Sequence, residues 1–209
     1  FTPQTGTNLQ GVPFKDISGT AHEAGLKLEL LKTGVIMTAS VFRNENTNFP
    51  ILVVNPVLGI NDFIQIGTGV TKGWETDISW QPNPNWSFIF AVSDVDSRNA
   101  DGTFIRGVQN DVNYRAVGKY TFTSGRLKGL AVGATLVTLA DRTGDPANSF
   151  TLDGYETVDV FSSYSTGRWR LQLNVYNVAD GHGVESDIVA TLAQTQRPLS
   201  ARLSLQYSF

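Results

Sequence analysis

In the sequence PLSARLSLQYSF, residues 198–209, apolar and polar residues alternate up to the aromatic Phe209. Successive side chains of a β-strand point to opposite faces, so one face of this segment is apolar and the other is polar. The apolar face carries Leu199, Ala201, Leu203, Leu205, Tyr207 and Phe209. A transmembrane β-strand needs roughly 9 to 11 residues, apolar toward lipid and polar toward the lumen, with aromatic residues at the interfaces. The segment therefore predicts a membrane-spanning β-strand.

The composition of the 209 residues also favours β structure over helix, with 20 Gly, 11% aromatic residues and only 17% charged residues. The longest hydrophobic run, residues 88–92, is far below the roughly 18 residues that a membrane-spanning helix needs. A helical membrane protein is therefore excluded. The mean hydropathy of -0.11 decides nothing, because alternation averages the two faces of each strand.

Charge and residue types exclude several functions. The net charge of -3 and the absence of a basic cluster leave no field that would attract nucleic acid. The sequence has no Cys, two His and neither a Gly-x-Ser-x-Gly nor a His-Glu-x-x-His motif. His182 between two glycines, and the spaced carboxylates Asp141 and Asp145, are best read as parts of solvated loops. We predict no enzyme activity, no cofactor and no metal site.

The alternating segments predict an all-β chain of nine antiparallel strands. The expected strands are residues 23–31, 35–44, 64–80, 86–94, 111–122, 130–139, 155–165, 169–178 and 198–209. Short connections rich in Gly, Pro, Asn and Ser are expected at 32–34, 81–85, 123–129 and 166–168. The loops between them, at 45–63, 95–110, 140–154 and 179–197, are long for hairpins of a compact soluble domain.

Short turns at one rim and long loops at the other are typical of an up-and-down outer-membrane barrel, whose periplasmic turns are tight and whose extracellular loops are large. This pattern places the C-terminus on the periplasmic side. Trp80, Trp86 and Trp169 all flank the expected short turns, where an interfacial aromatic belt would lie.

The polar faces of the expected strands carry charges. Glu75 and Asp77 point to one side of their strand, as Arg170 and Arg202 do in theirs. A dry core could not hold such charges unpaired, because burying an isolated charge costs several kcal/mol. We expect a hydrated interior. The strands at 35–44 and 130–139 alternate poorly, and the direction of their faces stays open.

Several motifs, in order along the whole chain, resemble the TonB-dependent outer-membrane receptors, particularly the siderophore-receptor branch. The motifs are FTPQTG at 1–6, EAGLK at 23–27, GWETD at 73–77, PNPNW at 82–86, FTLDGYETVD at 150–159, GRWRLQLNVYNVAD at 167–180 and LSLQYSF at 203–209. The resemblance implies a 22-stranded transmembrane barrel around an N-terminal plug. It also implies import of ferric siderophores or similar scarce ligands with energy delivered by the TonB–ExbB–ExbD system.

On this resemblance, residues 1–209 are the C-terminal part of the receptor barrel, about nine strands, without the plug and the first strands. The chain begins at Phe1 without a signal peptide, so we read it as a fragment or processed piece. The expected location is the outer membrane of a Gram-negative cell, in contact with lipid and lipopolysaccharide. Two departures leave the ligand open: the loop at 180–186 lacks the aromatic residues common in the family, and the loop near 50–62 is unusually apolar.

An anionic ferric siderophore would be attracted by Arg and aromatic side chains on the long extracellular loops. The candidate ligand-binding residues are Arg98, Phe104, Arg106 and Arg142. Solubility and binding of lipopolysaccharide phosphates are competing reasons for Arg in these loops.

Two other readings remain open at this stage. A passive porin or adhesin-type barrel would share the terminal Phe, the alternation and the loop asymmetry, but not the ordered motifs. A soluble β-sandwich with a carbohydrate-binding face would be monomeric without detergent. A membrane sheet with unpaired edges should instead aggregate when it is expressed alone.

Overall fold

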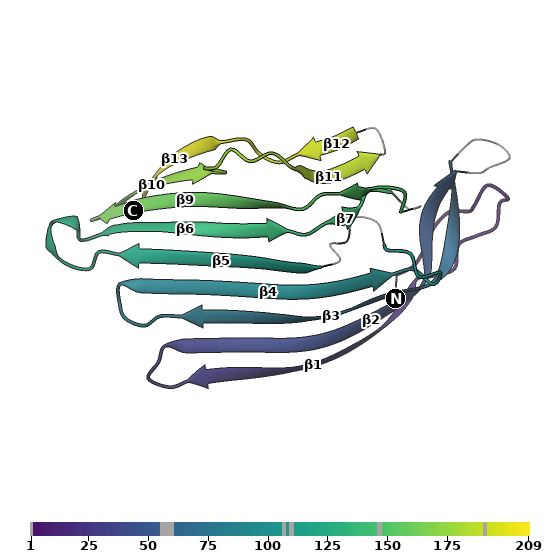
Figure 1. Cartoon of the computed structure of the whole chain (residues 1–209), viewed down its shortest axis with the longest axis horizontal. Coiled ribbons are helices and arrows are strands. Elements are labelled where there is room, and N and C mark those ends of the chain that lie inside the picture. Colours follow the sequence, from purple (N-terminus) through teal and green to yellow (C-terminus); the bar gives the residue numbers. More distant parts are fainter. Residues whose placement is uncertain (1, 55–60, 106–107, 109–110, 146–147, 190–191) are drawn as a thin grey trace.

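The structure is a computed structural model that describes residues 2–54, 61–105, 108, 111–145, 148–189 and 192–209. Nine strands lie side by side in one antiparallel sheet (Figure 1). They are β1 (Ser18–Leu30), β2 (Val35–Val54), β3 (Asn61–Trp80), β4 (Trp86–Arg98), β5 (Val112–Thr121), β6 (Leu130–Leu139), β9 (Tyr155–Thr166), β10 (Trp169–Tyr176) and β13 (Ser200–Tyr207). The predicted fold class and strand number are confirmed.

Short turns join the strands at one end of the sheet, and the longer connections lie at the other end (Figure 1). The turn after β5 contains the one-turn helix η1 (Gly125–Leu127). Two of the longer connections contain small hairpins, one of β7 (Arg142–Thr143) and β8 (Thr151–Leu152), the other of β11 (Val184–Val189) and β12 (Leu192–Thr195). In the described part of the chain, no helix has the length and apolar character needed to cross a membrane.

The loop expected at residues 45–63 is the main error of the sequence analysis. Strands β2 and β3 continue through this region, and their register runs without a change of direction from Val35↔Trp80 to Val54↔Asn61. The stretch of Ile, Leu and Val at 51–54, rich in β-branched residues, favours extended structure although it does not alternate. The paired strands therefore project beyond their neighbours at the loop end (Figure 1).

The two faces of the sheet differ in polarity, as the alternation predicts. Directly paired residues share a face of the sheet. One row across the sheet consists of Leu28, Met37, Ile78, Phe90, Ala116, Leu136 and Val158. The neighbouring row on the opposite face consists of Lys27, Thr38, Asp77, Ala91, Arg115, Val137 and Thr157. The register also shows which face each residue of the two poorly alternating strands occupies, because Met37 and Leu136 lie in the apolar row.

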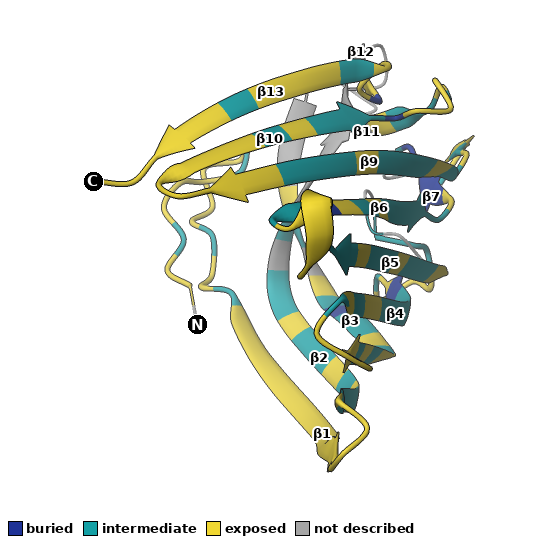
Figure 2. Cartoon of the chain, turned by 90° about the vertical axis from the view of Figure 1, so that its left-hand side faces the viewer, coloured by how far each residue is buried: buried dark blue, intermediate teal, exposed yellow. Residues whose placement is uncertain are grey.

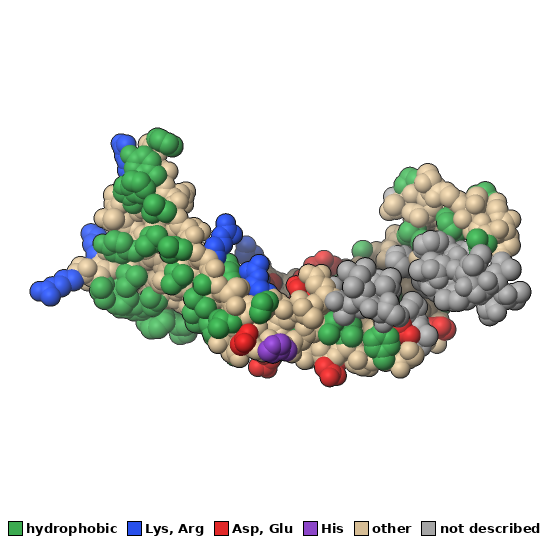
Figure 3. Space-filling view, turned by 90° about the horizontal axis from the view of Figure 1, so that it is seen from above, with side chains coloured by type: hydrophobic (Ala, Val, Ile, Leu, Met, Phe, Trp, Pro, Cys, Tyr) green, Lys and Arg blue, Asp and Glu red, His purple; other side chains and the backbone are tan. Residues whose placement is uncertain are grey.

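The sheet curls into an open arc (Figure 2). Lys and Arg side chains project into its hollow, and hydrophobic side chains gather on the outer side of the half that carries the short turns (Figure 3). Among the residues whose burial is described, Ala131 is the one buried hydrophobic residue, while Leu203 and Leu205 are 67% and 64% exposed. An apolar face of this size needs a covering in water. The two-layered soluble sandwich is therefore not the fold of this chain.

Aromatic rings gather at the short-turn end of the apolar face. Trp86 stacks on Phe88 with ring centroids 5.3 Å apart and meets Tyr120 edge-on at 4.8 Å. Further along the rim, Trp169 contacts Tyr207 at 4.7 Å. Amphipathic rings of this kind prefer the interface between hydrocarbon and water. The contacts support the aromatic belt that the three tryptophans predict.

Candidate ligand-binding pocket at the loop end of the hollow face

The hollow face of the sheet holds a pocket of about 660 Å³ at the loop end. Small-molecule sites in proteins usually have volumes of roughly 300 to 1,000 Å³. Its walls come from β6, β9, β10 and the β11–β12 hairpin with the segment that follows it. The lining residues are Val137, Leu139, Tyr155, Thr157, Asp159, Tyr176, Asn177, Glu185, Gln194, Thr195, Gln196 and Arg197. The pocket is thus mixed in character, with aromatic rings, amides and charges of both signs.

Asn177 holds the two sides of this pocket together and is only 2% exposed. Its backbone N–H donates to Asp159 Oδ1 at 2.8 Å, and its Nδ2 donates to the carbonyls of Gly181 at 2.8 Å and Arg197 at 3.0 Å. Its φ of 50° lies in the left-handed region, which Asn tolerates better than most residues. One side chain therefore fixes the chain where it leaves β10 and where it returns toward β13.

Arg197 is placed by this bond and presents its guanidinium to the pocket. The Arg197 Cζ lies 4.6 Å from the centroid of the Tyr176 ring, at the distance of a cation–π contact. In the described part of the chain Arg197 forms no ion pair. Its positive charge is therefore available to an anionic ligand.

Gln196 adds two polar atoms that lack partners. The residue is 8% exposed, and neither Oε1 nor Nε2 has a hydrogen bond to any described residue. Its backbone N–H donates to the Gly183 carbonyl at 2.8 Å, which holds the backbone at this position. A buried amide without partners costs free energy. A ligand or water in the pocket would satisfy it.

Of the ligand-binding residues predicted from the sequence, the described ones, Arg98, Phe104 and Arg142, do not line this pocket. Arg98 and Phe104 come together, with the Arg98 Cζ 4.3 Å from the ring centroid. Arg98 also donates through Nε to Asp96 Oδ1 at 2.8 Å and through one terminal nitrogen to the Gly102 carbonyl at 3.0 Å. It pairs with Val70 on the outer face of the sheet, so it is already engaged on the side away from the hollow.

Phe104 connects two loops through its backbone. Its N–H donates to Asn148 Oδ1 at 2.6 Å, and Asn148 Nδ2 donates back to its carbonyl at 3.1 Å. In the same loop, hydrogen bonds from the hydroxyl and the backbone N–H of Thr103 lower the pKa of Asp101. These bonds give the loop a defined shape.

Arg142 is 4% exposed and donates to the carbonyl of Val184, where the β11–β12 hairpin begins. Its other terminal nitrogen has no partner among the described residues. Arg106 lies outside the described residues. Arg142 thus supports the hairpin that covers the pocket, while Arg98 and Phe104 belong to a different loop.

The pocket residues themselves were missed by the sequence analysis. Alternation does place Tyr176 on the polar face of its strand, with Arg170, but residues 179–197 carry no periodic signal. The hydrogen bond from the Asn177 side chain to the Arg197 carbonyl joins residues that are 20 positions apart. A local sequence pattern does not predict such a contact. Among the described residues, no group of three or more His, Cys, Asp or Glu is placed to hold a metal ion.

One curled antiparallel sheet with an apolar outer face, a polar hollow and unequal rims defines part of a membrane β-barrel. Residues 1–178 match the family model described as TonB dependent receptor-like, beta-barrel, and the chain belongs to this family. The resemblance noted in the sequence is confirmed, and the proteins of this family are outer-membrane receptors.

A curated relative, the metal-pseudopaline receptor CntO of Pseudomonas aeruginosa, is 28% identical over 218 residues. That match covers 100% of this chain and 30% of the relative, so the chain spans less than a third of the relative's length.

Two solved structures share the fold. P. aeruginosa FpvA, in a complex with a pyoverdine and iron, superposes with a TM-score of 0.77 at 21% identity, covering 96% of this chain and 28% of that one. The ferric-catecholate import receptor Fiu of E. coli K12 superposes with a TM-score of 0.75 at 22% identity, covering 100% and 30%.

Proposed function

We propose that this chain is the C-terminal part of the barrel of an outer-membrane receptor that imports a metal chelate, a ferric siderophore or a similar scarce ligand. Membership of the TonB-dependent receptor family supports this proposal, as do the relatives named as receptors for metal-pseudopaline and ferric catecholates. Energy would come from the TonB–ExbB–ExbD system through a plug that lies outside these residues. The chain would act as a transporter and not as an enzyme.

The observation that carries the proposal is the pocket at the loop end of the hollow face. Siderophore chelates are compact and many are anionic, and a pocket of about 660 Å³ with a free guanidinium suits such a ligand. Arg197 supplies the charge, Tyr176 an aromatic surface, and Gln196 two unpaired polar atoms. A passive pore has no need for a pocket of this kind.

The orientation is part of the proposal: the short turns and the C-terminus face the periplasm, and the long loops face outward. Charged residues on the outer face of the sheet near the loop end support it. Arg43 pairs with Glu45 at 3.4 Å, and Asp96 pairs with both Lys72 at 3.4 Å and Arg98 at 2.8 Å. Such charges suit the headgroup level, where lipopolysaccharide phosphates lie, better than hydrocarbon.

Uptake by cells that carry the receptor containing this chain tests the proposal. Radiolabelled ferric chelates should enter cells with the intact receptor and fail to enter when TonB is deleted. An Arg197→Ala receptor should bind its chelate roughly 10-fold to 100-fold more weakly, since one charge-assisted contact is worth roughly 1.5 to 3 kcal/mol. Arg43→Ala, on the outer face, is the matched control and should bind normally.

Uptake that continues without TonB, together with leakage of unrelated small solutes, would favour the passive porin. Normal chelate binding by Arg197→Ala would remove the pocket from the proposal. The two outcomes are separable, because the first concerns energy coupling and the second concerns the site.

A further inference from the structure

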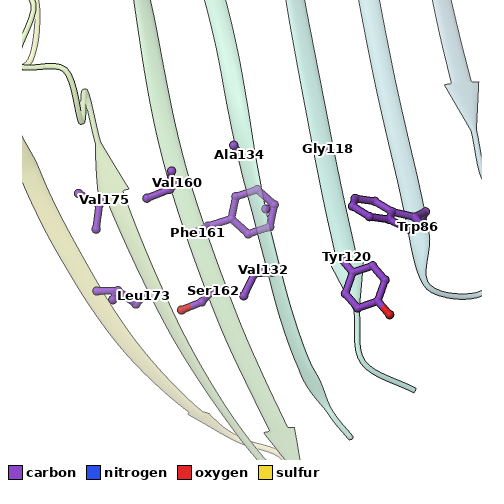
Figure 4. Close-up of a pocket in the computed structure, with 11 residues that line it drawn as sticks. Trp86, Gly118, Tyr120, Val132, Ala134, Val160, Phe161, Ser162, Leu173 and Val175 are labelled. Atoms are coloured by element: carbon purple, nitrogen blue, oxygen red, sulfur yellow. The ribbon is translucent and has the colours of Figure 1, made fainter. Parts of the chain in front are cut away.

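The apolar outer face carries a groove of about 540 Å³ that the proposed transport does not use. It crosses β5, β6, β9 and β10 in the half of the sheet near the short turns (Figure 4). Trp86 and Tyr120 stand at one side, and Leu173 lies at the other.

Small side chains make the groove. Gly118 pairs with Ala134, and in the next row Val132 pairs with Ser162. These positions face outward, where neighbouring rows carry larger apolar side chains, so the floor of the groove lies below its walls. The lining is mainly apolar, and a flexible hydrocarbon chain fits such a surface better than a polar molecule does.

The mouth of the groove is basic. The strands that form the groove end at two short turns. The turn between β5 and β6 contains Arg126 and Lys128, and the turn between β9 and β10 contains Arg168. All three residues are exposed, and in the described part of the chain none of them forms an ion pair. The short connections at 31–34, 81–85, 122–129 and 167–168 contain no Asp or Glu at all. This end of the sheet therefore attracts anions, although the whole chain is net acidic.

The spacing between the two features fits one molecule. From Leu130, where β6 begins after this turn, to Ala134 in the groove is four residues, roughly 13 Å of extended strand. One leaflet of a bilayer contributes roughly 15 Å of hydrocarbon. A lipid whose phosphate lies at the turns can thus place an acyl chain in the groove.

We infer that this groove binds an anionic phospholipid of the periplasmic leaflet, with its phosphate held by Arg126, Lys128 and Arg168 and one acyl chain against Gly118, Ala134 and Ser162. Charge complementarity at the turns and continuity with the apolar face select this occupant. The choice of leaflet rests on the orientation proposed above. The exposed Leu127 in the same turn anchors the mouth at the level of the interface.

Native mass spectrometry of the complete receptor in mixed micelles tests this inference. Micelles would contain equal amounts of phosphatidylglycerol, which is anionic, and phosphatidylethanolamine, which is zwitterionic. The receptor should retain phosphatidylglycerol at least fivefold more often. The triple change Arg126→Gln, Lys128→Gln, Arg168→Gln should remove this preference, and Lys32→Gln, in the turn between β1 and β2, should keep it.

Filling the groove gives an independent readout. Ala134→Leu should reduce retention of both lipids at this site severalfold, and Ala24→Leu, an exposed alanine of β1 on the same face, should not. Equal retention of the two lipids by the unaltered receptor would overturn the inference. It would also be overturned if Lys32→Gln lost the preference for phosphatidylglycerol as completely as the triple variant does. Recovery of a bound protein in place of lipid would overturn it as well.

The experiments distinguish a failure of the lipid site from a failure of the proposed transport. The groove variants should bind chelate normally, because the chelate pocket lies at the opposite end of the sheet. If chelate uptake is absent while the lipid preference holds, the transport proposal fails and the lipid site stands.

Discussion

Trp169 and Tyr207 lie against each other across the β10–β13 pair, with ring centroids 4.7 Å apart and planes inclined by 52°. They are direct partners in the register, and both side chains point to the apolar face. Tyr207 in turn meets Phe209 edge-on at 5.3 Å. The ring contacts therefore join the last strand to its neighbour at the level where the sheet leaves the hydrocarbon.

A double-mutant cycle should detect this contact. Trp169→Ala and Tyr207→Ala should show a coupling of about 0.5 to 1.5 kcal/mol in the unfolding free energy of the receptor in lipid, the usual size for an aromatic pair. A second cycle of Trp169→Ala with Trp74→Ala serves as the control, since the structure shows no contact between these two rings. Coupling of equal size in both cycles would contradict a specific contact.

The orientation of the sheet can be read by chemical labelling, because these 209 residues contain no Cys. Ala100→Cys lies in the exposed loop after β4, and Ser124→Cys lies in the exposed turn after β5. In intact cells, a membrane-impermeant maleimide should label Ala100→Cys and leave Ser124→Cys unlabelled until the outer membrane is opened. The receptor without an added Cys gives the background. The reverse pattern of labelling would invert the proposed orientation.

The sheet and its faces could be predicted from sequence because the period of a strand is local. Leu171 and Arg170 alternate, and their neighbours in the register alternate with them. The candidate site could not be predicted in the same way. Asn177 places Arg197 through a bond between two irregular segments, and Arg142 is held by the Val184 carbonyl. These contacts depend on how loops meet in space, and no repeating pattern records them.

The error at residues 45–63 has a related cause. Polar residues such as Glu45, Asn46 and Asn48 suggested a loop, yet Glu45 to Thr47 pair in register with β3. Hydrogen bonding along an already formed hairpin overrides the weak strand propensity of Asn. Strand propensity is a property of single residues, whereas the hydrogen bonds of the ladder form together.

Adjacent residues of β10 test which face meets lipid. Leu173 lies four residues from Trp169, about 13 Å along the strand, which places it well inside the hydrocarbon band. Leu173→Arg should destabilise the receptor in lipid by about 2 to 4 kcal/mol. Gln172→Arg points into the hollow beside Asn174, with which Gln172 shares a 3.1 Å hydrogen bond, and should cost less than about 1 kcal/mol. Denaturant unfolding of the two variants in vesicles measures the difference. Equal losses would show that the faces are not distinguished by lipid.

The isolated chain should not be stable as a monomer in water, because both edges of its sheet are open. In the described sheet β1 pairs with β2 alone and β13 with β10 alone, so each leaves a row of backbone groups without a strand partner. The apolar outer face adds exposed leucines such as Leu203 and Leu205. Open edges pair readily with other chains, and lipid offers them no hydrogen bonds. Size-exclusion chromatography and circular dichroism of residues 1–209 without detergent should therefore show aggregates rich in β structure. The same chain refolded with detergent is the control and should be more disperse. A folded monomer without detergent would contradict the membrane assignment of the outer face.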